Sequence, residues 1–450
     1  MILRADHSDK SFWLATYGPY TPNPPLAGDV KVDVAIIGGG FTGLSTAYNL
    51  RCDNPAMTVA VLESEVIGYG ASGRNGGFSM TLFGMEPAVT KALFGQQRMI
   101  EAHRYMERAV DYVDALVREH DLQSEYWFPG FLRVATTPAY ARRIQHDLEL
   151  LTSMGIGGIE WIDAERLRGE VDSQAFLGAW WEPRCGLLNP ARHVRELERL
   201  AQQFGVTVYE RTPVTQITRG ARFTLKTPGG TVTADKIVLA TNAYSHLIPE
   251  LRAKQHPVFT HMVVTEPLTP AQLASIGWKN RQGVEDARNL VHYFRLTADN
   301  RLAMGGSGIT LAYGRKMDCD LSPRFFADLE RDVVRLFPGL AGVRFTHRWG
   351  GPVSVAAQMA PAIGCLGDAR AVYSLGCQGH GVSLTHLNGR TLADLICERK
   401  TDLTDVWFVN RRVLPYPPEP LCFALSKAVL AYLEAEDWLR ERRTRSEAVR

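Results

Sequence analysis

The stretch VDVAIIGGGFTG at residues 32–43 decides the fold of this chain. Val32–Ile37 is a short apolar run rich in β-branched residues, which predicts a buried parallel strand. Gly38, Gly40 and Gly43 then form a G-x-G-x-x-G turn. The first glycine permits a tight turn, the second lets the backbone approach a pyrophosphate, and the third lets a helix pack on the strand. The stretch therefore predicts the start of a dinucleotide-binding unit.

The residues after this turn complete the unit. Residues 41–50 have helical character, and 58–62 read as a second strand that ends at Glu63. The helix N-terminus supplies free N–H groups and a positive dipole end for a phosphate, with Phe41 and Thr42 in its first turn. Glu63, followed by Ser64, would accept hydrogen bonds from ribose hydroxyls. The alternative, a glycine turn that binds nothing, does not explain why strand, helix and acid occur together.

A second glycine-dense loop indicates FAD rather than a nicotinamide cofactor. Residues 64–78 read SEVIGYGASGRNGGF, where a nicotinamide enzyme would normally continue into a helix. Such a loop lets the backbone approach a flat ligand closely. The alternative is a flexible surface loop, which the run of small residues around one cation argues against. The predicted flavin contacts in this loop are Gly70, Ala71, Ser72, Arg74, Asn75, Gly76 and Gly77.

A third glycine cluster stands between a predicted strand at 371–375 and a helix at 385–399. A helix that starts there would direct its positive end at the flavin and stabilise the charge of the reduced ring. The predicted contacts are Gly376, Gln378, Gly379, His380, Gly381 and Val382, together with Val214, Thr241 and Asn242 from segments nearer the middle of the chain.

The chain exceeds the roughly 250–300 residues at which one core stops growing, so two domains are expected. The predicted class is α/β (α+β overall): a Rossmann-like FAD-binding domain interleaved with an antiparallel-sheet substrate domain. A long amphipathic helix is predicted at 97–120, and a hairpin around 297–300. The expected division is an extended N-terminal arm at 1–29, an FAD-binding domain at 30–80, 150–245 and 340–400, a substrate domain at 81–149 and 246–339, and a helical tail at 401–450.

Several motifs, in the same order along the chain, resemble those of a known family. They are GYGASGRNGG at 68–77, GLLNPARHV at 186–194, KIVLATNAYS at 236–245, HYFRLTADNRLAMGG at 292–306, WGGPVS at 349–354 and LGCQGHGV at 375–382. With them the chain resembles the FAD-dependent oxidoreductases of the D-amino-acid oxidase superfamily. The branch it resembles most contains gamma-glutamylputrescine oxidoreductase, glycine oxidase and sarcosine oxidase. The resemblance covers nearly the whole chain.

The resemblance implies oxidation of a C–N bond in an amine or amino acid. Hydride passes to flavin N5, the imine hydrolyses, and oxygen takes the electrons as hydrogen peroxide. No cysteine stands just before Trp349, where sarcosine oxidase attaches its flavin, so noncovalent FAD is expected. An apolar residue, Ala303 or its neighbour, replaces a lysine important for oxygen reactivity. A dehydrogenase that uses a quinone or carrier protein therefore stays open, as does a flavin-binding subunit of a hetero-oligomeric oxidase; a nicotinamide-dependent dehydrogenase is a more distant alternative.

Six residues are the candidates for substrate contacts: Arg295, Tyr293, His380, Trp349, His261 and Gln358. Arg295 would clamp a substrate carboxylate or pair with a surface acid, and strand alternation puts Tyr293 on its side. His380 would be a structural histidine or a base, and Trp349 a pocket wall or core. Arg74 is expected to contact flavin or to order its loop.

The overall amino-acid composition limits the kinds of binding partner that can be expected. Hydrophobic residues make up 45% and charged residues 22%, and the net charge is +2, which does not suggest a nucleic-acid surface. Seven scattered cysteines without metal spacing predict reduced thiols, no metal site and a cytoplasmic location. No apolar stretch approaches the length of a membrane span. A small-molecule amine or amino acid and molecular oxygen are the expected partners, and a homo-oligomer stays open.

Overall fold

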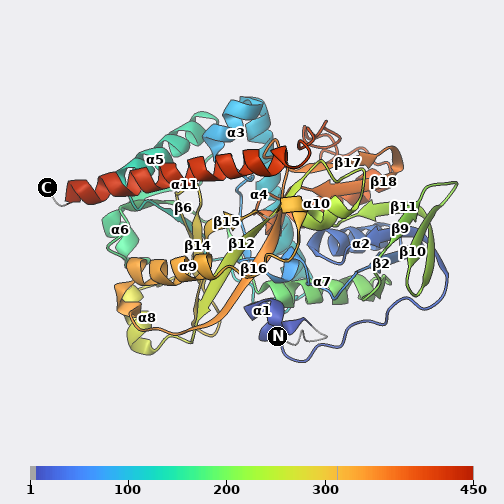
Figure 1. The fold of residues 1–450 in the computed structure, drawn as a ribbon, viewed down its shortest axis with the longest axis horizontal. Helices are drawn as coiled ribbons and strands as arrows, with labels where there is room; N and C mark the ends of the chain where they lie inside the picture. The colour runs from blue at the N-terminus through green and yellow to red at the C-terminus, as the bar shows by residue number, and fades with distance from the viewer. Residues whose placement is uncertain (1–6, 312, 449–450) are drawn as a thin grey trace.

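The computed structural model describes residues 7–311 and 313–448 and contains two large β-sheets, one beside the other (Figure 1). The first sheet has the order β17-β18-β11-β1-β2-β8, and the neighbours from β18 to β8 pair in parallel. The hairpin β9–β10 extends it from β11, and β17 pairs antiparallel with β18. Its strands are β1 (Val30–Ile37), β2 (Val59–Leu62), β8 (Thr207–Tyr209), β9 (Gln216–Thr218), β10 (Phe223–Thr227), β11 (Gly230–Leu239), β17 (Ala362–Leu366) and β18 (Asp368–Leu375).

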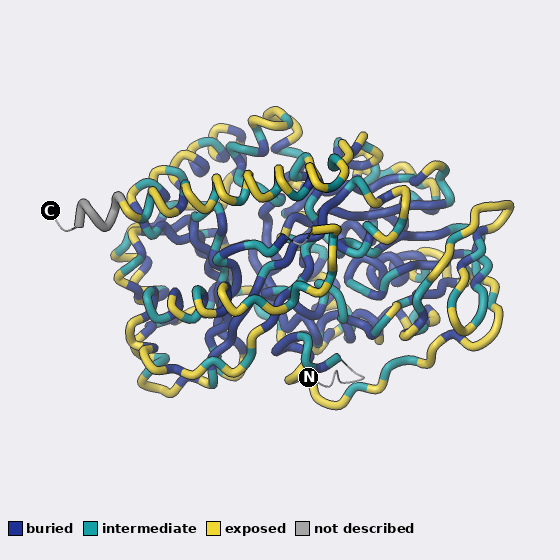
Figure 2. Tube along the Cα trace, in the orientation of Figure 1, coloured by how far each residue is buried: buried dark blue, intermediate teal, exposed yellow. Residues whose placement is uncertain are grey.

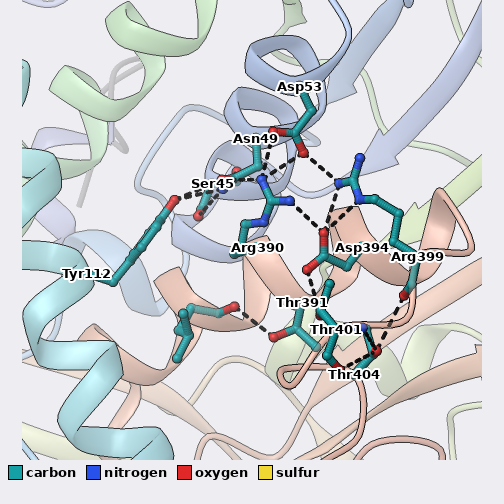
Figure 3. A network of polar contacts seen from close by, with 11 residues as sticks. Ser45, Asn49, Asp53, Tyr112, Arg390, Thr391, Asp394, Arg399, Thr401 and Thr404 are labelled. Atoms are coloured by element: carbon teal, nitrogen blue, oxygen red, sulfur yellow. Dashed lines mark hydrogen bonds and ion pairs between the residues drawn. The ribbon is translucent and has the colours of Figure 1, made fainter.

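Helices α2 (Phe41–Asp53), α4 (Gln96–Glu119), α7 (Pro190–Gln203) and α10 (Gly381–Ile396) pack against one another beside this sheet. An ion-pair network ties α10 to α2 (Figure 3). Arg390 of α10 bonds both Asp53 of α2 and the buried Asp394, and Arg399 bridges the same two carboxylates. The helix behind the glycine turn is thereby fixed to the helix that follows the third glycine cluster.

The second sheet has the order β16-β12-β15-β14-β13-β4-β6-β5 and is antiparallel except for the pair β13–β4. Both sheets are buried along most of their length (Figure 2). Its strands are β4 (Phe131–Val134), β5 (Glu160–Asp163), β6 (Gly178–Glu182), β12 (His256–Thr265), β13 (Gly283–Asp286), β14 (His292–Leu296), β15 (Leu302–Thr310) and β16 (Phe345–Val355). A small two-stranded sheet, β3 (Phe78–Ser79) with β7 (Gly186–Leu187), stands apart.

The remaining helices are short or lie around the second sheet. They are α1 (Phe12–Ala15), α3 (Pro87–Phe94), α5 (Pro138–Ser153), α6 (Ala164–Arg168), α8 (Pro270–Ile276), α9 (Pro323–Leu336) and α11 (Leu421–Ala448), with 3-10 turns at Ser8–Lys10, Ala71–Gly73, Asn242–Leu247, Tyr313–Arg315 and Pro338–Leu340. None of the described helices is both long and apolar enough to cross a bilayer.

The α/β class predicted from the sequence is confirmed, as are the long helix α4 and the β14–β15 hairpin. The prediction of an extended arm is wrong at Phe12–Ala15, which form helix α1. The Ser11 Oγ caps this helix by accepting from the Leu14 N–H at 3.1 Å. Phe12, Trp13 and Leu14 are buried in a cluster with Trp349, so the arm contributes to the core.

The division between the two sheets departs from the expected domain ranges at two places. Strands β5 and β6 fall within 150–245, and β16 falls within 340–400, yet all three belong to the second sheet. We propose that these strands belong with the substrate-binding half and that the chain crosses between the halves more often than the motifs suggested. Parallel and antiparallel strands of similar length have similar local sequences, so the sequence alone did not separate them.

The C-terminal helix α11 is anchored to the rest of the protein by one buried acid. The Asp437 carboxylate is 1% exposed and accepts hydrogen bonds from Tyr140 Oη at 2.9 Å and from the backbone N–H groups of Asn289 at 2.9 Å and Leu290 at 3.0 Å. Much of the helix's outer face is exposed (Figure 2). The predicted helical tail is confirmed at Leu421–Ala448 but not at residues 401–420, which form turns and loops, and the attachment of the helix is polar and specific.

We expect Asp437→Ala to lower the free energy of unfolding by about 3 kcal/mol, because it leaves three donors, two of them buried, without an acceptor. Urea unfolding followed by far-UV circular dichroism measures this change. Glu434→Ala is the matched control, since Glu434 is an exposed acid of the same helix. Equal unfolding midpoints for the two variants would show that Asp437 does not anchor α11.

Candidate functional site

One cavity of about 1630 Å³ lies between the two sheets and is lined by residues of both. Pockets for drug-sized ligands are usually about 300–1000 Å³, so this volume has room for a dinucleotide and a second small molecule. The glycine turn after β1 and the loop after β2 line one part. Strands β12, β13, β14 and β15 line another.

The glycine turn is a cradle that larger residues would fill. Gly38 has φ +108°, and a Cβ there would lie 2.6 Å from the Ala240 carbonyl oxygen. A Cβ on Gly40 would lie 2.8 Å from Ser72 Oγ, which accepts a hydrogen bond from the Phe41 N–H at 3.0 Å. Gly43 packs so tightly that a Cβ would lie 2.0 Å from the Gly38 carbonyl oxygen. This backbone therefore meets the requirements of a pyrophosphate site.

Glu63 stands at the end of β2, where a ribose would lie. Its carboxylate accepts hydrogen bonds from the Gly39 N–H at 2.7 Å and the Glu65 N–H at 3.1 Å. Burial raises the pKa of Glu63, and these two N–H groups counteract the rise. Because each carboxylate oxygen has two lone pairs, the group retains acceptor capacity toward the cavity.

Arg74 and Asn75 order the second glycine loop. Arg74 is 2% exposed; its Nε donates to the Tyr69 carbonyl at 2.7 Å and its Nη1 pairs with Asp320 at 2.8 Å. Asn75 Nδ2 donates to the Ala71 carbonyl at 3.0 Å, and its Oδ1 accepts from the Gly77 N–H at 2.8 Å. The loop is held by its own side chains, which leaves its surface free to contact a flat ring.

The third glycine cluster presents polar atoms that lack partners. Both amide atoms of the buried Gln378 and Nδ1 of His380 have no hydrogen-bond partner within residues 7–311 and 313–448. Helix α10 begins at Gly381, so its N-terminus lies beside them. Unpaired buried polar atoms cost about 1–3 kcal/mol each, which a ligand with donors and acceptors would recover. A flavin ring fits this set.

Most residues predicted to contact the cofactor line the cavity: Gly38, Gly40, Phe41, Thr42, Glu63, Ser64, Gly70, Ala71, Ser72, Arg74, Asn75, Gly76, Val214, Thr241, Asn242, Gln378, Gly379, His380, Gly381 and Val382. Within the described chain, Gly43, Gly77 and Gly376 are not part of the lining. A Cβ on Gly43 or Gly77 would meet a backbone carbonyl oxygen at 2.0 Å or 2.2 Å, so these glycines support the lining from behind.

Of the six predicted substrate contacts, Tyr293 and His380 line the cavity. His261 is buried on the opposite face of β12 from Thr260 and Met262, because side chains alternate along a strand, and it stacks on Phe325 at 5.4 Å. Gln358 Oε1 accepts from the Leu414 N–H at 3.1 Å and from Arg411, outside the lining.

Arg295 and Trp349 also lie outside the lining of the described chain. Neither suggested role of Arg295 is present: it is 1% exposed and donates to the Leu188 carbonyl at 2.7 Å and to the carbonyls of Gly76 and Gly77. Arg295 thus holds the second glycine loop in place through the carbonyls of Gly76 and Gly77. Trp349 is core, 2% exposed, and its Nε1 donates to the Arg74 carbonyl at 2.8 Å.

A row of polar side chains lies on the second sheet, and of its members only Tyr293 was predicted from the sequence. Glu285 of β13 pairs in register with Tyr293 of β14 on one side and with Arg133 of β4 on the other, and all three line the cavity. Charged residues inside a fully buried strand such as Gly283–Asp286 are the signal that could have identified the row.

The described residues also contain one group with metal-ligand chemistry: His256, Glu419 and Cys422, whose ligand atoms lie within 4.8 Å of one another. They come from two distant segments, so cysteine spacing did not reveal them. The Arg315 guanidinium interacts with the Cys422 thiol, so a cation bound there would lie beside a positive charge. This cluster is not part of the cavity lining described above.

Comparison with known proteins agrees with this geometry. Residues 33–395 match the family described as FAD dependent oxidoreductase (DAO). The chain is 33% identical to gamma-glutamylputrescine oxidoreductase of Escherichia coli over 86% of its length and 88% of that protein. It is 25% identical to the sarcosine oxidase subunit beta of an Arthrobacter species, over 74% of this chain and 78% of that subunit.

Solved structures share the fold. Glycine oxidase from Geobacillus kaustophilus superposes with a TM-score of 0.72 at 21% identity, covering 85% of this chain and 99% of that one. L-amino acid deaminase from Proteus myxofaciens gives a TM-score of 0.71 at 18% identity, covering 89% of this chain and 96% of the other.

Proposed function

Because this chain belongs to the family of FAD-dependent oxidoreductases, we propose that it oxidises a C–N bond of a small amine or amino acid and passes the electrons to oxygen, forming hydrogen peroxide. The observation that carries the proposal is the single cavity that joins the glycine cradle to the polar row on the second sheet. The relatives named for gamma-glutamylputrescine, sarcosine and glycine support it, because all three compounds contain a C–N bond.

Bound FAD would supply the acceptor for the hydride of the substrate carbon. The protein's own residues bind and orient. The three glycine clusters would hold the cofactor along one wall, and Tyr293, Glu285 and His380, which also line the cavity, would face the substrate. Burial raises the pKa of Tyr293 to about 12, so its hydroxyl stays protonated and can donate a hydrogen bond at neutral pH.

We further propose that FAD is bound without a covalent link. Of the seven cysteines, all within the described residues, Cys377 alone lines the cavity, with its Sγ 3.5 Å from Asn242 Nδ2. Acid precipitation should release all of the yellow flavin into the supernatant. Flavin retained in the pellet would point to Cys377 as the attachment site. All seven thiols are free, which agrees with the cytoplasmic location that we propose.

We expect the flavin absorbance of the purified protein to bleach when amines are added without oxygen, and to return when air is admitted, with peroxide released. Dithionite serves as the control, because it reduces any bound flavin. Bleaching by an amine without rapid return would instead favour a dehydrogenase with another acceptor. A flavin that dithionite bleaches but no amine or amino acid does would contradict catalysis and favour the role of a flavin-binding subunit.

A further inference from the structure

We propose that Glu285 binds the ammonium group of the substrate and that the pocket therefore selects amines whose reacting carbon carries no carboxylate. This inference rests on the proposed C–N oxidation and narrows its substrate class. It follows from where Glu285 lies, from what surrounds its carboxylate, and from how the arginines near the cavity are engaged.

Glu285 lies in the middle of the row that faces the cavity. It is 4% exposed, and its register neighbours Tyr293 and Arg133 line the same space. A Cβ on Gly76 of the flavin loop would lie 3.1 Å from the Tyr293 ring, so this row directly faces the loop. The carboxylate is therefore placed beside the part of the cavity that the second glycine loop borders.

The carboxylate of Glu285 has no close ion pair or hydrogen bond within the described chain, although the neighbouring Arg133 guanidinium interacts with it electrostatically. The nearest basic atom is Nε2 of His380 at 3.8 Å, and no arginine or lysine nitrogen of the described residues lies within 4.0 Å of it. It accepts no side-chain hydrogen bond in the described chain. A buried carboxylate costs several kcal/mol unless it is paired, so a cationic ligand is the group that this site lacks.

The buried arginines near the cavity each pair with a group of the protein, although Nε of Arg133 and Nη2 of Arg74 have no hydrogen-bond partner in the described chain. Arg133 Nη2 pairs with Glu86 at 2.8 Å, and Arg143 pairs with the same carboxylate. Arg74 pairs with Asp320, and Arg295 donates to backbone carbonyls outside the lining. Arg142 and Arg219 also line the cavity but are exposed, so they can meet a negative group only at the solvent side, and Arg440 pairs with Glu436. An α-amino acid would thus meet Glu285 without a free bidentate partner nearby.

Glu285 can also deliver the amine in the form that is oxidised. An alkylammonium ion transfers one N–H proton to a Glu285 carboxylate oxygen: the N–H bond breaks, an O–H bond forms, and a neutral amine and a protonated carboxyl result. No electrons change hands in this step. His380, whose Nδ1 has no partner in the described chain, lies next to the carboxyl and can pass the proton on.

A matched pair of ligands that cannot be oxidised tests binding apart from turnover. tert-Butylamine has no hydrogen on the carbon beside nitrogen, and pivalate has the same shape with a carboxylate. We expect the FAD-loaded protein to bind tert-butylammonium at least about tenfold more tightly than pivalate, as measured by titration calorimetry. Glu285→Gln should lose this tenfold preference and retain its flavin. Glu434→Gln, an exposed acid of α11, is the control that should keep the preference.

A second pair tests turnover: pentylamine and norleucine differ only by the carboxylate on the reacting carbon. Anaerobic flavin reduction should half-saturate at a concentration at least about tenfold lower for pentylamine, and Glu285→Gln should raise that concentration about tenfold or more. Tighter binding of pivalate, faster reduction by norleucine, or an unchanged Glu285→Gln variant would overturn this inference and leave C–N oxidation standing. Ammonium binding without any flavin reduction by either compound would overturn the proposed oxidation alone.

Discussion

Replacing Gly43 with alanine is expected to reduce the bound FAD about tenfold or more, although alanine is the better helix former by about 1 kcal/mol. The added Cβ would lie 2.0 Å from the Gly38 carbonyl oxygen and 3.3 Å from Ile36. Neither the oxygen nor the helix can give way without moving the backbone of the glycine turn. Because we propose that this backbone cradles the cofactor, the clash should be transmitted directly to the pyrophosphate site, at a cost of about 1–3 kcal/mol.

The ratio of flavin to protein absorbance after gel filtration measures this loss. Gly157→Ala is the control, because a Cβ there meets nothing within 4 Å. Far-UV circular dichroism separates the two ways in which FAD can be lost: an unchanged spectrum means a distorted cradle, whereas a reduced spectrum means an unfolded chain. Full flavin content in the Gly43→Ala variant would refute the tight helix–turn packing.

Trp349→Ala is expected to destabilise the fold by about 3–5 kcal/mol, the usual cost of truncating a buried aromatic residue. The Trp349 side chain packs edge-on against Trp13 with ring centroids 6.5 Å apart, and its Nε1 donates to the Arg74 carbonyl. The substitution removes the packing between the N-terminal segment and β16, and it also frees a carbonyl of the flavin loop. We therefore expect weaker FAD retention as well.

Denaturant unfolding measures the effect of Trp349→Ala, and two further variants serve as its controls. Trp438→Ala makes the same chemical change at a site that is 55% exposed and should shift the unfolding free energy by less than about 0.5 kcal/mol. Trp349→Phe retains most of the ring and loses the hydrogen bond, at about 1 kcal/mol. If Trp349→Ala were as mild as Trp438→Ala, the junction between α1 and β16 would contribute little to stability.

The cofactor side of the protein was predictable because its signals are local. A strand, a glycine turn and a helix N-terminus are encoded within about a dozen residues, and Gly38, Glu63 and His380 all reach the cavity as expected. Backbone atoms form most of this cradle, so the direction of individual side chains matters little. The same reasoning found the strand and helix on either side of the third glycine cluster.

The substrate side was not predictable in the same way, because it depends on side-chain direction and strand order. His261 and Thr260 are neighbours in sequence, yet Thr260 alone of the two lines the cavity. Arg295 shares a face with Tyr293 but ends among the carbonyls of Gly76, Gly77 and Leu188. Glu285 gains its place from pairing with β4, a strand about 150 residues earlier in the chain. The pairing register of strands that are distant in the sequence cannot be predicted from local sequence patterns.

The strand order of the first sheet sets a condition on the synthesis of this protein. Strand β1 pairs with β11, and β11 pairs with β18, so the sheet needs residues 30–37, 230–239 and 368–375 together. Until residues 368–375 are synthesised, Ile237–Leu239 of β11 lack the neighbour that β18 supplies, although β1 and β10 already pair with β11, and the cofactor cannot organise a finished site. Truncation before residue 375 should therefore yield an aggregation-prone product.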